Sequence, residues 1–238
     1  MKQLLFLIAA PLLMFTACKK EKTVRQIDSS YNPNVSPGKF TSSTNLSNPY
    51  FPFLAGKKYI FEGQTPDGLE RIEEQRLATT KTILGITCVV VEFKAFLNGV
   101  LIEKAIDWYA QDTTGTVWYF GEAVDNYNAN GSLKDHAGSF EAGVDGAKPG
   151  TIMPANPQTG MSYREEYYFN NAEDRAEILA TGQTVTIPYG TYTNCIKTRN
   201  WTELESTLNE NKYFAPGIGL VKEVNIKDGS EIKLIAIQ

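Results

Sequence analysis

Histidine and cysteine are scarce in this sequence. His136 is the only histidine, and three cysteines stand far apart among the 238 residues. Zinc sites draw most of their ligands from these two residue types, at short spacings. The sequence therefore predicts no metal site of this kind. A lone histidine next to Asp135 in a polar stretch favours a surface residue over a general base.

Positive charge and catalytic motifs are also limited. The chain has 23 lysine and arginine residues against 27 acidic residues, which gives a net charge of −4. Because nucleic-acid binding requires a basic patch, we expect no nucleic-acid partner. The Gly-x-Ser-x-Gly elbow of serine hydrolases does not occur in the sequence. We expect a non-catalytic protein without a cofactor.

Pairs of acidic residues leave one route to catalysis open. Glu165–Glu166 and Glu173–Asp174 are adjacent acidic pairs. Two carboxyl groups act in a glycoside hydrolase only if the fold sets them about 5 to 10 Å apart across a cleft. The sequence does not give that separation, so an enzyme acting on glycans or esters stays an alternative.

Long apolar runs are missing after the first residues. The chain opens with MKQLLFLIAAPLLMFTA, which places Lys2 before an apolar run from Leu4 to Phe15. This run is shorter than the roughly 20 residues of a membrane-spanning helix. Its layout predicts a secretory signal peptide over residues 1–17.

The end of this segment carries a lipidation signal. Phe15-Thr16-Ala17-Cys18 resembles the lipobox of bacterial lipoproteins, which implies a lipidated Cys18 at the mature N-terminus. The alternative is an ordinary cleaved signal with an unrelated cysteine. More than one acyl chain anchors a protein stably, so we expect a lipid-anchored protein of the bacterial cell envelope. Lys19 and Lys20, in place of an acidic residue, favour the outer membrane over the inner.

Residues 18–48 are predicted to form a flexible tether. The stretch after Cys18 is polar throughout and rich in serine, asparagine, threonine and proline. Such a composition does not bury a hydrophobic core. The remaining residues, 49–238, have the size of one ordinary domain.

Strand signals dominate this domain. Stretches rich in β-branched and aromatic residues alternate with turn residues, at 57–63, 86–96, 100–111, 116–122, 183–188, 191–201, 212–216, 218–226 and 231–237. Residues 69–80 have no apolar stripe at helical spacing and are expected to form a long polar strand. Residues 171–180 are expected to form a short helix. Asn98-Gly99 and Asn130-Gly131 predict tight hairpin turns.

Two segments of the domain resemble each other. Residues 108–118, WYAQDTTGTVW, align without a gap with residues 212–222, KYFAPGIGLVK. Each is preceded by a turn glycine and then by a strand that carries a cysteine. This order predicts an internal duplication, with two related β-meanders over about 49–140 and 161–238. The fold class is therefore mainly β, an antiparallel curved sheet or half-barrel with little helix.

The motifs DWYAQD, GTVWYFGE, EAGVDGAKPG and KYFAPGIGLVKEV together resemble a family of uncharacterised secreted bacterial β-proteins. The resemblance covers nearly all of residues 49–225. It implies a curved antiparallel sheet, like the half-barrels of lipoprotein carriers and related envelope proteins. It implies no activity and assigns no site residues.

Gly217 and Gly219 stand two residues apart, and we consider whether they form a phosphate-binding loop for a nucleotide. A phosphate loop leads its glycines into the N-terminus of a helix. Here the residues from Leu220 to Val224 continue as a predicted strand. We therefore interpret the glycine pair as a β-turn.

Calcium binding has weak sequence support. Asn126, Asn128 and Asn130 precede Gly131 at the spacing of a calcium loop, but carboxylates are missing and Ala137 stands where the bidentate glutamate belongs. A hairpin is the preferred interpretation. A looser calcium site is an alternative to solvated acids at strand ends, and its members would be Asp107, Asp112, Glu122 and Asp125.

Cys88 and Cys195 occupy matching places in the two repeats. In an exported protein a disulfide between them can persist. The alternative is two buried free cysteines that act as small apolar residues. The sequence leaves both open.

The segment 141–160 has no helix or strand pattern, and such long irregular segments often serve as lids or binding loops. We expect it to close the concave face of the sheet over an apolar or amphiphilic envelope molecule. The candidate ligand residues are Asp145, Met153, Pro154, Trp108 and Trp118. A structural or protein-interaction lipoprotein, docked to another envelope protein, is the first alternative function, and the hydrolase is the second.

Overall fold

The computed structural model describes residues 25–205 and 207–238. The predicted signal peptide, residues 1–17, and Cys18 lie outside these residues. The described chain forms one antiparallel sheet of 15 strands and one short 3₁₀ turn, η1 (Pro37–Lys39). The strands are β1 (Lys58–Thr65), β2 (Gly68–Ile83), β3 (Ile86–Leu97), β4 (Val100–Gln111), β5 (Val117–Tyr127), β6 (Leu133–Asp135), β7 (Phe140–Glu141), β8 (Lys148–Met153), β9 (Ser162–Arg164), β10 (Glu166–Tyr167), β11 (Arg175–Ile187), β12 (Gly190–Trp201), β13 (Asn209–Ala215), β14 (Gly219–Asn225) and β15 (Glu231–Ile237).

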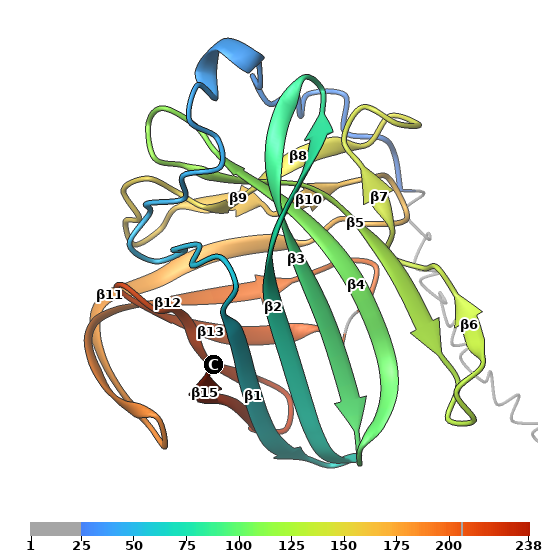
Figure 1. The fold of residues 1–238 in the computed structure, drawn as a ribbon, viewed down its shortest axis with the longest axis vertical. Helices are drawn as coiled ribbons and strands as arrows, with labels where there is room; N and C mark the ends of the chain where they lie inside the picture. Colours follow the sequence, from blue (N-terminus) through green and yellow to red (C-terminus); the bar gives the residue numbers. More distant parts are fainter. Residues whose placement is uncertain (1–24, 206) are drawn as a thin grey trace, which may run out of the picture.

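Two meanders build the sheet. Strands β1 to β5 follow one another in the sheet, as do β11 to β15, and the pairing of β1 with β15 joins the two sets. Figure 1 shows the sheet curling on itself, so that β11–β13 cross behind β2–β4. The predicted mainly β, antiparallel, curved architecture is confirmed.

The sheet remains open at one seam. Its edge strands in the described chain are β10, which pairs with β8, and β9, which pairs with β11. Only Glu165 separates these two strands in the sequence. The Glu165 backbone N–H donates to the carbonyl of Asp174 at 2.8 Å. One short segment therefore supplies both edges of the sheet.

The alternation of side chains along the strands creates two faces. Val89 of β3 packs inside the curl with Ile178, Ile196 and Phe214 of the opposite meander. Cys88 and Val90 point to the other face, where they pack with Trp108 and Phe120. A third cluster forms where the β11–β12 hairpin packs against β1, β14 and β15, and it includes Tyr59, Phe61, Val185, Cys195 and Leu234.

The segment before β1 is packed rather than free where the structure describes it. Phe40 and Leu46 are 6% and 5% exposed, and the Phe40 ring lies edge-on to Phe120 at 5.6 Å. Ser43 Oγ donates to the Thr87 carbonyl at 2.6 Å, and Asn48 Nδ2 donates to two carbonyls at 3.0 Å. The expectation of a flexible tether to residue 48 is therefore not met, because two apolar side chains and local hydrogen bonds are enough to dock this segment.

Two secondary-structure expectations need correction. The predicted helix over residues 171–180 is instead a turn followed by β11, in which Ala176 and Ile178 are fully buried at a spacing of two. The segment 141–160 contains β8, which pairs with β5. Its glycines and prolines hide this strand in the sequence.

Other expectations are confirmed. Residues 69–80 lie in the long strand β2, and Asn98-Gly99 turns β3 into β4. Gly217 lies in the turn between β13 and β14, and Gly219 begins β14; both have positive φ. The two repeat segments both span hairpins. The internal duplication itself stays a prediction.

Candidate functional site

A cavity of about 370 Å³ lies inside the curled sheet, and we call it the interior cavity. Strands β2 to β5 form one wall, and β13 and β14 form the opposite wall. Its apolar and aromatic lining is Phe51, Val91, Phe93, Ala105, Tyr109, Tyr119, Ile152, Leu208, Phe214 and Leu220. Its acidic lining is Glu74, Glu103, Asp107, Glu122, Glu165, Glu166, Asp174 and Glu223.

Strand register separates an aromatic level from an acidic level. Tyr109 and Tyr119 are paired across β4 and β5, and their rings stack at 4.8 Å between centroids. The next inward-facing pair on these strands is Asp107 with Glu122. On the opposite wall Phe214 faces the aromatic level. The stacked tyrosines therefore lie toward one end of the cavity, and the carboxyls lie beyond them, together with Val91, Phe93 and Ala105.

Asp107 is the most enclosed acid of the β2–β5 wall. It is 7% exposed, and Tyr119 Oη donates to its Oδ1 at 2.6 Å. Burial raises the pKa of Asp107 to about 7. Burial, followed by the nearby Asp107 charge, also raises the pKa of Glu122 well above its usual value. Removal of these carboxyls from water disfavours their charged forms.

A second buried carboxyl lies at the seam. Asn200 Nδ2 donates to both carboxyl oxygens of Glu165, at 2.9 and 2.8 Å. Thr198 Oγ1 donates in turn to Asn200 Oδ1. Burial raises the pKa of Glu165 to about 7. Burial and the charge of Asp174 raise the pKa of the neighbouring Glu166 well above its usual value.

Two basic side chains belong to the described lining, and both are engaged. Lys212 Nζ lies 3.2 Å from Glu223 Oε1 and 3.8 Å from Glu210 Oε2. Burial lowers the pKa of Lys212, but these carboxylates outweigh burial and raise it above the usual value. Arg76 donates to the Pro52 carbonyl at 2.9 Å, and its guanidinium lies 3.7 Å from the Tyr59 ring centroid.

A smaller acidic space adjoins the interior cavity. This end chamber, of about 160 Å³, lies at the hairpin ends of β1–β2 and β14–β15. Glu223 lines both spaces. The other acids of the end chamber are Asp67, Glu70, Glu210 and Asp228. Negative charge therefore extends from the interior toward this end of the sheet.

The five residues that the sequence suggested as ligand contacts lie elsewhere. Trp108 packs on the outer face, under Lys81 Nζ at 3.5 Å from the ring centroid. Trp118 Nε1 donates to Asp112 Oδ2 at 2.9 Å. Met153 is fully buried in the core, and the Pro154 carbonyl accepts from Asn48. Asp145 is exposed in a turn, so the segment 141–160 reaches the cavity only through Ile152.

Cys88 and Cys195, the cysteines within the described residues, are free and buried. Cys88 belongs to the cluster under Phe40, whereas Cys195 belongs to the cluster with Tyr59 and Leu234. Burial raises the pKa of Cys88 to about 12. The structure thus has the free-thiol alternative and not the disulfide.

The residues considered for calcium binding separate into three places. Asp107 and Glu122 line the interior cavity, Asp112 organises the β4–β5 turn through Thr114 and Thr116, and Asp125 lies 3.0 Å from His136 Nδ1. His136 is a surface residue, with 63% of its side chain exposed. Within the residues that the structure covers, no group of three or more acidic, histidine or cysteine side chains could hold a metal ion.

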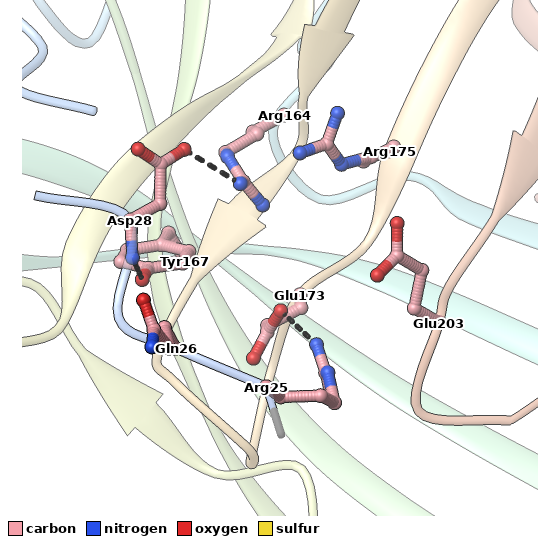
Figure 2. A pocket seen from close by; sticks show the side chains of 8 residues that line it. All are labelled: Arg25, Gln26, Asp28, Arg164, Tyr167, Glu173, Arg175 and Glu203. Carbon is pink, nitrogen blue, oxygen red and sulfur yellow. Dashed lines mark hydrogen bonds and ion pairs between the residues drawn. The ribbon is translucent and has the colours of Figure 1, made fainter. Parts of the chain in front are cut away.

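A larger open groove of about 510 Å³ lies at the seam. Figure 2 shows that the described start of the chain occupies one side of it, with Asp28 bonded to Arg164 at 2.8 Å and Arg25 bonded to Glu173. Asp28 N–H also donates to Tyr167 Oη at 2.6 Å. Its charges are largely paired within the protein, and its walls are polar. We therefore take the interior cavity as the candidate site.

The sequence contains a signal for the acidic wall in the spacing of its glutamate and aspartate residues. Glu70 and Glu74 of β2, and Glu103 and Asp107 of β4, stand four residues apart. An even spacing places them on one face of a strand. An acidic strand face normally lies against solvent. Here the opposite meander covers this face, so that it lines an interior cavity.

Comparisons with family models, curated proteins and solved structures find no match to this chain. Across residues 25–205 and 207–238, no helix has the length and hydropathy of a membrane span.

Proposed function

We propose that this protein is a non-catalytic binding protein that holds a small amphiphilic molecule in the interior cavity. The observation that carries the proposal is the division of this cavity into an aromatic level around Tyr109 and Phe214 and an acidic level around Asp107 and Glu223. Pockets that bind small molecules are mostly apolar, with a few polar groups that set orientation. An amphiphile matches both levels at once.

The proposed location is the bacterial cell envelope, with a lipid anchor on Cys18 and the outer membrane favoured over the inner. Residues 25–31 are held against the seam by Arg164, Tyr167 and Lys148. An anchor at Cys18 would therefore hold the cavity close to the membrane surface. An envelope amphiphile would then be available at short range.

Native mass spectrometry of the purified full chain tests the binding function. We expect an added mass that disappears on denaturation and that is absent from a variant with a filled cavity, Ala105→Phe. Ala105 is buried in β4 and lines the cavity. A matched control, Val144→Phe, changes an exposed side chain. Equal retention of the added mass by both variants would contradict binding in this cavity.

One observation favours an enzyme as the second candidate. Asp107 and Glu165 both line the cavity and have pKa values raised to about 7 by burial. Carboxyls tuned toward neutrality serve as general acids in hydrolases. Hydrolysis of nitrophenyl glycosides or esters by the full chain, lost in Glu165→Gln, would favour this alternative.

A further inference from the structure

We infer that the ligand of the interior cavity carries a protonated amine at the carboxyl-rich level and an alkyl or aryl chain at the aromatic level. This inference rests on the proposed binding function and specifies the chemical class of the ligand. A neutral amphiphile or a fatty acid would satisfy the proposed function but not this inference.

The first argument is the balance of charge in the lining. Eight carboxyl side chains and two basic side chains line the cavity. The basic groups are already committed. Lys212 is paired with Glu223 and Glu210. Arg76 contacts the Pro52 carbonyl, the Tyr59 ring and, at 3.9 Å, Glu74. A buried carboxylate needs a countercharge or hydrogen-bond donors. The excess of acid therefore calls for donors from outside the protein.

The second argument is the unused bonding capacity of two enclosed carboxyls. Asp107 and Glu166 are each 7% exposed and line the cavity. Tyr119 donates to Asp107 Oδ1, and no hydrogen bond from a described residue reaches Oδ2. Glu166 Oε1 has a long contact of 3.4 Å with the Asp174 N–H, and its Oε2 has no donor among the described residues. An ammonium group has three donors and no acceptor, which matches these free oxygens.

The third argument concerns the two chemical levels. Tyr109, Tyr119 and Phe51 form a contiguous aromatic surface, with centroid separations of 4.8 and 5.0 Å. This surface suits an apolar chain. The two basic side chains of the described lining are already paired, so a carboxylate or phosphate head group would find no free cation among the carboxyls, and the site disfavours fatty acids and phospholipids.

The fourth argument concerns access. Glu223 lines both the interior cavity and the end chamber, and the lining of the end chamber adds four more acids. A cleft lined by charges of one sign raises the local concentration of the opposite charge. The acidic end chamber thus favours cations at the end of the sheet that lies next to the interior cavity. The raised pKa values of Asp107 and Glu166, caused first by burial, agree with carboxyls that lack a countercharge.

Isothermal titration of the full chain at pH 7 with three probes of equal chain length tests the inference. The probes are octylamine, octan-1-ol and octanoate. We expect octylamine to bind roughly ten-fold more tightly than octan-1-ol, because hydrogen bonds to charged groups are the stronger ones. Octanoate is expected to bind most weakly of the three.

Three variants locate the effect. Asp107→Asn and Glu166→Gln each remove one cavity carboxyl at nearly constant volume, and each should weaken octylamine by roughly ten-fold without weakening octan-1-ol. Asp145→Asn removes the same charge from an exposed turn with positive φ, which asparagine tolerates, and should leave all three affinities unchanged. Two cavity variants are used so that a folding defect in one leaves the other informative.

The outcomes separate the two proposals. Equal affinity for octylamine and octan-1-ol, or octylamine binding that survives both cavity variants, overturns the amine inference and leaves the binding function standing. Tighter binding of octanoate also overturns it. Failure of all three probes to bind contradicts both the inference and the proposed function.

Discussion

At the scale of single residues, Asp107 shows how a buried carboxyl shapes this molecule. It stands beside Glu122 on the inner face of the β4–β5 pair and accepts one hydrogen bond from Tyr119. A carboxyl in this position gains little from ionising, because few donors replace the water it loses. In the empty protein, ionised Asp107 lowers the free energy of unfolding because no countercharge among the described residues faces it. The same lack of a countercharge makes Asp107 suitable for a cationic ligand.

The variant Asp107→Asn should therefore stabilise the empty protein at pH 8. Asparagine keeps an acceptor for Tyr119 and carries no charge to desolvate, so we expect the free energy of unfolding to rise by about 1 to 2 kcal/mol. Urea unfolding at pH 8 measures this, with Asp145→Asn as the exposed control. A loss of stability at pH 8 would show that Asp107 has a stronger partner than Tyr119.

Phe40 decides whether the segment before β1 belongs to the domain. Its ring is 6% exposed and contacts the cluster with Phe120 and Ala142. Replacement by alanine should lower the free energy of unfolding by about 3 kcal/mol. Thermal unfolding of Phe40→Ala beside Ile27→Ala, where the side chain is 66% exposed, tests this. No difference between the two variants would mean that the tether extends to residue 48 after all.

At the scale of elements, the seam is a place where the packing of neighbouring strands leaves little space for a side chain. Gly150 of β8 lies so close to the seam that a Cβ there would sit 2.2 Å from the Glu165 carbonyl carbon. Any side chain at this position must push β8 away from the segment that holds β9 and β10. Glycine here is a packing requirement, since its φ is not positive.

Gly150→Ala should lower the free energy of unfolding by about 2 kcal/mol through this overpacking. It should also shift Glu165 relative to Asn200 and so weaken binding in the cavity. Gly38→Ala is the matched control, because nothing lies within 4 Å of its Cβ position. Chemical denaturation of both variants gives the comparison, and equal stability would mean that the seam is loose.

Most strands were predictable from sequence, and the reasons are local. β-Branched and aromatic residues mark β3 and β12, and Asn98-Gly99 marks its hairpin through the positive φ of both residues. Strand β8 was not predictable, because its sequence, KPGTIM, begins with turn residues. Charged residues around Ala176 and Ile178 likewise masked the strand period of β11.

At the scale of the whole molecule, the carboxyl-rich interior makes stability depend on pH. Asp107 and Glu165 have folded pKa values of about 7, above the values near 4 of an unfolded chain. Between about pH 4 and pH 7 the unfolded carboxyls have lost their protons while the folded ones keep them. The free energy of unfolding therefore falls as the pH rises through this range.

We expect the melting temperature to be about 5 °C higher at pH 5 than at pH 8. Surface acids with lowered pKa values, such as Glu73 beside Lys58 and Glu231 beside Lys233, act in the opposite direction only below about pH 4.5. Differential scanning calorimetry across pH 4 to 9 measures the profile. The difference should shrink in Asp107→Asn, and a higher melting temperature at pH 8 would contradict the buried state of these acids.

The site itself was beyond sequence reasoning for a global reason. The even spacing of Glu103 and Asp107 establishes that they share a face, but only the curl of the sheet decides that this face is enclosed. The aromatic residues near 108–118 drew attention to the right strands, yet Trp108 and Trp118 belong to other environments and Tyr109 and Tyr119 line the cavity. Which strand face is enclosed depends on the long-range pairing between the two meanders, and the local sequence does not determine that pairing.

The seam also affects how copies of this protein behave toward one another. A sheet edge is a template for a neighbouring chain, and long exposed edges lead to fibrils. Here the edges are β9, three residues long, and β10, two residues long. Residues 25–31 bond to both through Arg164 and Tyr167. A fifteen-stranded sheet is thereby kept from growing by addition of further strands, a property that would suit the lipid-anchored protein proposed above, since an anchor would concentrate it on a membrane surface.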